Sequence, residues 1–208
     1  MTLALRTERA SGTLVAGVIS PVLFLAVSVL QMPFNPDLDL TKHAFSYLSI
    51  GETGPIQQIN FVVMGALNIV AAMGLRVRVG SVGAVLLAVD GLGQIIAGVF
   101  TLDPSNGFPA GAPAGLPETV STHANLHGVG FALSMVSWVV LLLVLARWYH
   151  RFGDRGWAVA SVACAIALLI TAACLMTPFG TVLLYVVLTT AWLFMAATIA
   201  HLRTATPR

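Results

Sequence analysis

Two histidines, His123 and His127, stand four residues apart where an apolar segment begins. On a helix this spacing projects both imidazoles from one face, an arrangement that zinc sites often use. His43 and Asp103 lie in two connections that we expect at the same membrane depth as this pair. Three imidazoles and one carboxylate suit zinc, so we predict His43, His123 and His127 as metal ligands.

A zinc ion with an open coordination position would give these residues a definite chemistry. Such an ion lowers the pKa of its bound water toward 7 and supplies hydroxide for attack on an ester or amide. Asp103 is the candidate base, and Ser46 is the candidate for orienting the substrate. Structural alternatives stay open: the pair Asp103-Pro104 could end a helix, Ser46 could bond its own backbone, and the histidines could bond loop carbonyls.

Asp90 is a separate candidate, because it falls about 15 Å from the inner end of its apolar segment, near the middle of a bilayer. An ionised carboxylate is costly there, so Asp90 must be protonated or have a partner. Small and polar residues continue its helical face outward, in a track suited to proton movement or a substrate cavity: Gln94, Ala97 and Thr101. The structural alternative is a hydrogen bond between helices, from Asn60 or Asn68 to a protonated Asp90.

Hydrophobic segments must position these residues. The chain of 208 residues is 58% hydrophobic and 9% charged, with a mean hydropathy of +0.92, so it has too few charges to cover a soluble globule. A helix needs about 20 mostly apolar residues to cross a bilayer. We predict an all-α bundle of six transmembrane helices in a single domain over residues 1–208, with spans near 13–32, 59–75, 81–102, 126–147, 157–177 and 181–201.

Positive charge gathers on one side of this predicted bundle. Arginines precede the first span and follow the second, fourth and sixth: Arg6, Arg9, Arg76, Arg78, Arg147, Arg151, Arg155, Arg203 and Arg208. Cytoplasmic loops carry an excess of arginine and lysine. We therefore expect a multi-pass protein of the cell membrane with its N and C termini in the cytoplasm.

The two long connections, 33–58 and 103–122, fall on the outer side and hold most of the other polar residues. The first predicts a short interfacial helix, because apolar residues recur in it at helical spacing: Leu40, Ala44, Phe45 and Leu48. The second is interrupted by proline and glycine throughout and predicts an irregular, lid-like loop. We expect any site to open on this face.

Small residues inside the spans predict close packing of helices. Glycines that fit this role occur on the third and fourth spans: Gly91, Gly98, Gly128 and Gly130. The helical face that carries His123 and His127 continues through Ser134 and Ser137. This small and polar seam predicts that both imidazoles point into the bundle.

Three short motifs carry a family resemblance: His43-Ala-Phe-Ser46-Tyr-Leu-Ser49, Gly98-Val-Phe-Thr-Leu-Asp103-Pro104, and the pair His123 and His127. With them the chain resembles, over nearly its whole length, the domain of unknown function 998 family, which implies a compact six-span membrane protein and no established activity. A looser chemical likeness links it to the alkaline ceramidase superfamily of membrane hydrolases. That likeness implies zinc held among Ser46, Asp103 and the three histidines, although that superfamily has seven spans and a histidine pair on its last helix.

Four functions fit these observations. The leading hypothesis is a membrane enzyme that hydrolyses a lipid or lipid-like substrate with the help of a metal, most simply zinc. The alternatives are a proton-coupled transporter of small molecules that uses Asp90, an acid-catalysed isoprenoid cyclase, and an accessory subunit without catalysis. The bilayer is the expected partner, and the oligomeric state is left open. Nucleic acid is excluded as a partner, because the net charge of +2 comes from arginines at the membrane border.

Overall fold

Six long helices run through the structure in alternating directions. The structure is a computed structural model that describes residues 3–204, and side chains from residue 10 onward. The helices are α1 (Leu3–Gln31), α2 (Gly54–Arg78), α3 (Ser81–Val99), α4 (Thr122–Arg151), α5 (Arg155–Cys174) and α6 (Gly180–Thr204). Each contains a stretch long and apolar enough to cross a membrane. The prediction of an all-α bundle with six spans is confirmed.

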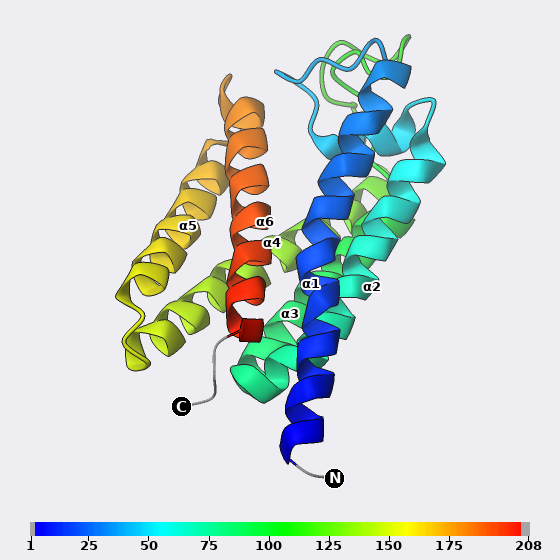
Figure 1. Ribbon diagram of the computed structural model, residues 1–208. Coiled ribbons are helices and arrows are strands. Elements are labelled where there is room, and N and C mark those ends of the chain that lie inside the picture. The colour runs from blue at the N-terminus through cyan, green and yellow to red at the C-terminus, as the bar shows by residue number, and fades with distance from the viewer. Residues whose placement is uncertain (1–2, 205–208) are drawn as a thin grey trace.

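The six helices form a closed ring. Each packs against the next one in sequence, and α6 returns to pack against α1 (Figure 1). The start of α1 and the end of α6 lie at one end of the bundle, whereas the long connections lie at the other end. The side chains of Arg6 and Arg9, and the whole of Arg208, fall outside the part of the chain that the structure describes.

The helices differ in length from the predicted spans. Four of them extend past the apolar segments, because residues at a membrane border can continue the helical hydrogen bonds outside the hydrocarbon. α3 and α5 instead end three residues earlier than predicted, at Val99 and Cys174. At the end of α3, Phe100 already has an extended backbone, with φ −105° and ψ 128°. Hydrophobicity measures where a chain can be buried, and it does not mark where a helix stops.

The first outer connection contains two short 3₁₀ helices, η1 (Met32–Phe34) and η2 (Phe45–Ile50). The predicted interfacial helix from Leu40 is therefore wrong in its start and in its type. The reason is a turn just before η2, in which the backbone N–H of His43 donates to the Asp39 carbonyl over 2.8 Å. The ring of Phe45 then packs inward against Phe24 and Tyr185, so that η2 belongs to the outer end of the bundle.

The second outer connection is irregular, as predicted, and it is folded onto the first. Its own backbone bonds include Asn106 N–H to the Gly115 carbonyl at 2.9 Å and Gly107 N–H to the Pro113 carbonyl at 2.7 Å. Phe108 is only 2% exposed and its ring contacts His43 and Tyr47. The two connections together cover the end of the ring that lies opposite the chain termini (Figure 1).

Glycines bring α3 very close to its two neighbours. A Cβ on Gly93 would stand 2.6 Å from the Gly130 carbonyl oxygen of α4, and a Cβ on Gly91 would stand 2.5 Å from the Gly65 carbonyl oxygen of α2. Neither distance leaves room for a side chain. Gly128, also predicted as a packing residue, is wrong: it faces open space because it lies on the outward side of α4.

Candidate functional site

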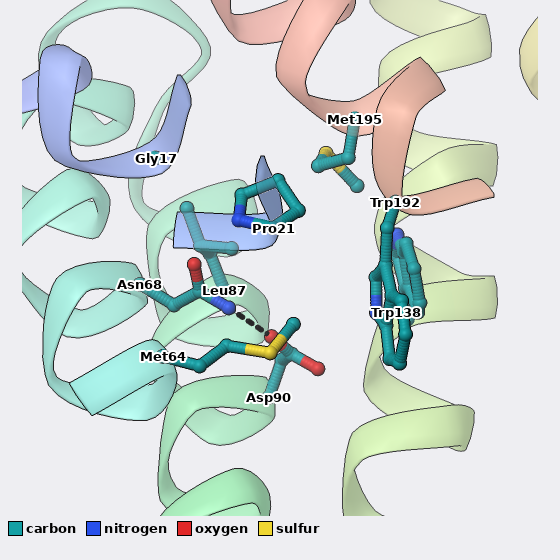
Figure 2. Close-up of a pocket in the computed structure, with 9 residues that line it drawn as sticks. All are labelled: Gly17, Pro21, Met64, Asn68, Leu87, Asp90, Trp138, Trp192 and Met195. Carbon is teal, nitrogen blue, oxygen red and sulfur yellow. Dashed lines mark hydrogen bonds between the residues drawn. The ribbon is translucent and has the colours of Figure 1, made fainter. Parts of the chain in front are cut away.

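Asp90 lies at the middle of α3 and is only 5% exposed. Two neighbouring helices donate hydrogen bonds to its carboxyl group. Asn68 of α2 donates through Nδ2 to Oδ2 over 2.7 Å, as Figure 2 shows. Ser134 of α4 donates through Oγ to Oδ1, also over 2.7 Å. We call Asp90, Asn68 and Ser134 the Asp90 network.

The close glycine contacts explain why this network forms. In the contact between Gly65 and Gly91, Gly65 precedes Asn68 by three residues and Gly91 directly follows Asp90. In the contact between Gly93 and Gly130, Gly130 lies about one helical turn before Ser134. Because the backbones almost touch, the short side chains of asparagine and serine can reach the carboxyl group. The sequence proposed Asn60 or Asn68 as the partner, and the structure selects Asn68.

The network continues outward by one residue. Gln94 donates from Nε2 to the Ser134 hydroxyl oxygen over 3.0 Å, one helical turn above Asp90. Beyond Gln94, the predicted polar track is no longer formed by side chains of α3. Ala97 offers its backbone carbonyl to the His127 ring at 2.9 Å, and Thr101 lies beyond the end of α3. Polar contacts therefore follow α3 from Asp90 toward its outer end.

The charge of Asp90 has no counterion among residues 10–204. Elsewhere in this part of the chain, Lys42 pairs with Asp39 and the His201 ring lies beside Asp154. Both contacts are 3.0 Å long and lie at the ends of the bundle. The partners of Asp90 are an amide and a hydroxyl, which are neutral. A carboxyl group in the middle of a membrane is stable either as the neutral, protonated acid or as a carboxylate paired with a cation.

A small cavity adjoins Asp90 at the centre of the ring. Five of the six helices line it, with α5 as the exception, through Gly17, Pro21, Met64, Asn68, Leu87, Asp90, Trp138, Trp192 and Met195. In this conformation it has room for about one water molecule. Figure 2 shows Asp90 and Met64 on one side and the two tryptophans on the other. The indole rings stack, with centroids 6.1 Å apart and planes 15° apart.

The three predicted metal ligands do not meet. His43 uses both ring nitrogens: Nδ1 accepts from the Asp39 backbone N–H at 2.9 Å, and Nε2 lies 3.0 Å from the Asn106 carbonyl. His127 is buried, with Nδ1 at 2.9 Å from the carbonyls of both Ala97 and Phe100. His123 is exposed beside Phe100 instead of pointing into the bundle, because it lies in the first turn of α4.

Asp103 and Ser46, the predicted base and the residue predicted to orient the substrate, both form hydrogen bonds within their own connections. Asp103 Oδ2 accepts from the Ser121 N–H at 2.8 Å, just before α4, and hydrogen bonds from the hydroxyl and N–H of Ser121 lower the pKa of this carboxyl group. Ser46 lies in η2, where its carbonyl accepts from the Ser49 hydroxyl at 2.6 Å. Among the described residues, no three histidine, cysteine, aspartate or glutamate side chains are grouped so that they could hold a metal ion.

Two features of the centre were missed from the sequence. One is the pairing of Trp138 with Trp192, for which a partial signal exists: Trp138 follows Ser134 by four residues and so shares its helical face. The other is Pro21, a proline in the middle of the first span, which is itself a visible signal. Both lie on the cavity that Asp90 adjoins.

Comparison with known proteins places the chain in a family without assigning it an activity. No curated protein and no solved structure matches it. A family described as "Protein of unknown function (DUF998)" matches residues 18–200, which include the whole of α2 to α5, parts of α1 and α6, the Asp90 network and both long connections. The resemblance noted from the three short motifs is thereby confirmed, and this multi-pass membrane protein belongs to the DUF998 family.

Proposed function

We propose that this protein is a membrane carrier that moves a small molecule across the bilayer and binds and releases a proton at Asp90 during its cycle. One observation carries the proposal. The Asp90 carboxyl group is buried at the middle of a ring of six helices, beside a cavity, and among the described residues no cation pairs with it. Its charge must therefore change or be matched whenever the cavity is filled or emptied.

The partners of Asp90 suit a group that changes its protonation state. The Asn68 amide can donate to a carboxylate oxygen or to the carbonyl oxygen of the acid. The Ser134 hydroxyl can rotate, donating to a carboxylate or accepting from the acid O–H. Each state of Asp90 thus keeps its hydrogen bonds, so that neither state strands a buried polar group. A positively charged partner would instead have fixed Asp90 in its ionised form.

Metal-assisted hydrolysis has less support from the geometry. His43 would have to lose two hydrogen bonds, and His127 would have to turn away from the end of α3, before either could join His123 around an ion. The Asp90 network needs no such rearrangement to bind a proton.

The orientation of the carrier follows from its arginines. The start of α1 and the end of α6 lie at the same end of the bundle (Figure 1). Six arginines lie at or next to helix ends on that side: Arg76, Arg78, Arg147, Arg151, Arg155 and Arg203. We place this side in the cytoplasm by the positive-inside rule. The cover made by the two long connections then faces outward. Reporter fusions at the two termini and within residues 110–116 test this placement, and an inward-facing loop would contradict it.

Proton flux in proteoliposomes tests the proposed function. Purified protein is reconstituted with a pH-sensitive dye inside, a pH gradient is imposed, and small cations, neutral solutes and anions are added in turn. We expect at least one compound to cause a protein-dependent proton flux that Asp90→Asn abolishes. Glu118→Gln is the matched control, because it makes the same change of acid to amide in the exposed outer loop. A flux that survives in Asp90→Asn, or no flux with any compound, would contradict the proposal.

A further inference from the structure

The cavity beside Asp90 offers acceptors and aromatic faces to whatever enters it. Resting on the proposed function, we infer that the molecule carried is a small organic amine, bound as a monocation, that also has an oxygen atom able to accept hydrogen bonds. The Asp90 carboxyl group, the backbone of α1 and the faces of the two tryptophans select the positive charge, and the indole N–H groups select the oxygen.

Pro21 removes the regular helical donor of one backbone carbonyl in α1, that of Gly17. Proline has no N–H, so the carbonyl of Gly17, four residues earlier in α1, loses the donor that a regular helix would give it. Gly17 and Pro21 both line the cavity. In Figure 2 the Pro21 ring and Asp90 lie on the same side of the two tryptophans. A carboxyl group and a backbone carbonyl that lacks its regular helical donor, both from residues at one cavity, favour a guest that carries N–H donors and a positive charge.

The tryptophans add a surface that attracts cations. The faces of indole rings bind ammonium groups through the negative charge of the π system, more strongly than those of tyrosine or phenylalanine. Trp138 is 5% exposed and Trp192 is 6% exposed, so both are shielded from water. Cation–π attraction is stronger in such dry surroundings. The wall opposite Asp90 is therefore also suited to a positive guest.

The indole N–H groups select the second feature of the ligand. Nε1 of Trp138 and Nε1 of Trp192 are buried, and neither has an acceptor among the described residues. Burying a donor without a partner is costly, and such groups in native proteins call for a specific explanation. An ether, hydroxyl or carbonyl oxygen on the guest would accept from them. A hydrocarbon amine would leave both unsatisfied.

The charge balance of the cycle follows from this assignment. The empty cavity holds protonated Asp90, and an arriving ammonium ion replaces that proton, so the net charge of the site stays at zero. When the amine leaves, a proton returns to the carboxylate. One proton is therefore exchanged for one cation, without net charge movement. Because the present conformation has room for about one water molecule, the ring must open before the amine can enter.

Three probes of nearly equal size and different charge test the inference. They are 2-phenoxyethylamine, a cation with an ether oxygen; 2-phenoxyethanol, its neutral analogue; and phenoxyacetate, an anion. Binding is measured by calorimetry on the full chain in nanodiscs of neutral lipid, with empty nanodiscs as the blank. We expect the amine to bind at least about tenfold more tightly than the alcohol, and phenoxyacetate not to bind. Calorimetry in two buffers of different ionisation enthalpy should also record about one proton released per amine bound.

Variants assign this preference to the cavity. Asp90→Asn should weaken amine binding by at least about thirtyfold while leaving the alcohol unchanged, because it removes the buried partner of the charge. Trp192→Leu should weaken it about tenfold through the lost aromatic face. It also keeps the inference testable if Asp90→Asn does not fold. Glu118→Gln should bind like the native chain.

Each result has a distinct meaning. Equal binding of the amine and the alcohol, tighter binding of phenoxyacetate, or no binding of the amine would overturn the inference of an amine substrate. Those results would leave the carrier function standing wherever another compound drives a proton flux that depends on Asp90. Tight, Asp90-dependent amine binding without any proton flux in proteoliposomes would do the reverse, supporting the amine site and removing the carrier.

Discussion

Two buried polar clusters cross the bundle, and they differ in one chemical respect. The Asp90 network joins α2, α3 and α4 around a carboxyl group. The second cluster, which we call the amide cluster, joins α1 to α2 through Ser28, Gln31, Gln57 and Asn60. It contains amides and a hydroxyl, and no group that can change its charge.

The bonds of the amide cluster account for almost all of its polar atoms. The Gln57 amide oxygen lies 2.8 Å from Gln31 Nε2 and 3.2 Å from Asn60 Nδ2, and its nitrogen lies 3.1 Å from the Ser28 hydroxyl. Gln31 Oε1 is left without a partner. Such a set holds helices together and carries no charge that a proton or a ligand must balance. The Asp90 network also holds helices together, but its charge is completed only by a proton or a ligand.

The largest expected effect separates the two clusters by activity. Asp90→Asn should lower proton-coupled flux at least about a hundredfold, because asparagine cannot carry the proton. The fold should survive, since an amide can still bond to Asn68 and Ser134. Flux in proteoliposomes and the melting temperature in detergent measure the two effects. A melting temperature that falls steeply would make Asp90 a structural residue like those of the amide cluster.

The amide cluster should show the opposite pattern. Gln57→Leu removes the centre of the cluster and should lower the free energy of unfolding by about 1–2 kcal/mol, because its partners lose bonds inside the membrane. Flux per folded molecule should be unchanged. Gln58→Leu is the matched control in the next position, where the side chain makes one bond, to the Ser49 carbonyl at 3.1 Å. The free energy of unfolding in mixed micelles compares the two variants. An equal decrease in both would show that the amide cluster stabilises the fold no more than the single Gln58 hydrogen bond does.

His127 tests whether a titratable residue can also act as part of the framework. Its ring bonds the carbonyls of Ala97 and Phe100, which the end of α3 would otherwise leave without donors. His127→Leu should cost about 1 kcal/mol of unfolding free energy. His123→Leu, in the exposed member of the pair, should cost almost nothing. Elemental analysis should find the same zinc content in both variants and in the native chain, whereas zinc lost with His127 would revive the metal site.

The same contrast explains which parts of the site the sequence could predict. The depth of Asp90 follows from counting residues along one helix, and Asn68 was one of two partners proposed for it. The contact between Trp138 and Trp192 depends on how α4 and α6 are rotated about their axes, which no local pattern sets. His43 was predicted as a metal ligand, but the direction of its side chain comes from the turn at Asp39 and from Asn106 in a distant loop. Residues on one helix could be predicted, and contacts between loops could not.

The smallest expected effect concerns a second aspartate held by similar donors but placed in water. Hydrogen bonds from Ser121 lower the pKa of Asp103. A carboxyl group whose pKa is lower in the folded chain stabilises the fold above its unfolded pKa of about 3.9, and this stabilisation is lost as the pH falls through the lower folded value. Because Asp103 lies near solvent at the end of the bundle opposite the chain termini, solvent screens the effect, and only the start of α4 should loosen.

Amide exchange of Ser121, followed by NMR, measures this loosening. Protection of the Ser121 amide should decrease as the pH falls from about 5 to below the folded pKa of Asp103. In Asp103→Asn, this protection should already be reduced at neutral pH and should not change further as the pH falls. Glu118→Gln changes a carboxyl group three residues from Ser121. The Ser121 hydrogen bonds join it to Asp103, Ala124 and Asn125, so this variant should behave like the native chain. Flux should not change in Asp103→Asn. If it fell as far as in Asp90→Asn, burial would not be what distinguishes the two carboxylates, and the outer aspartate would belong to the path of the proton.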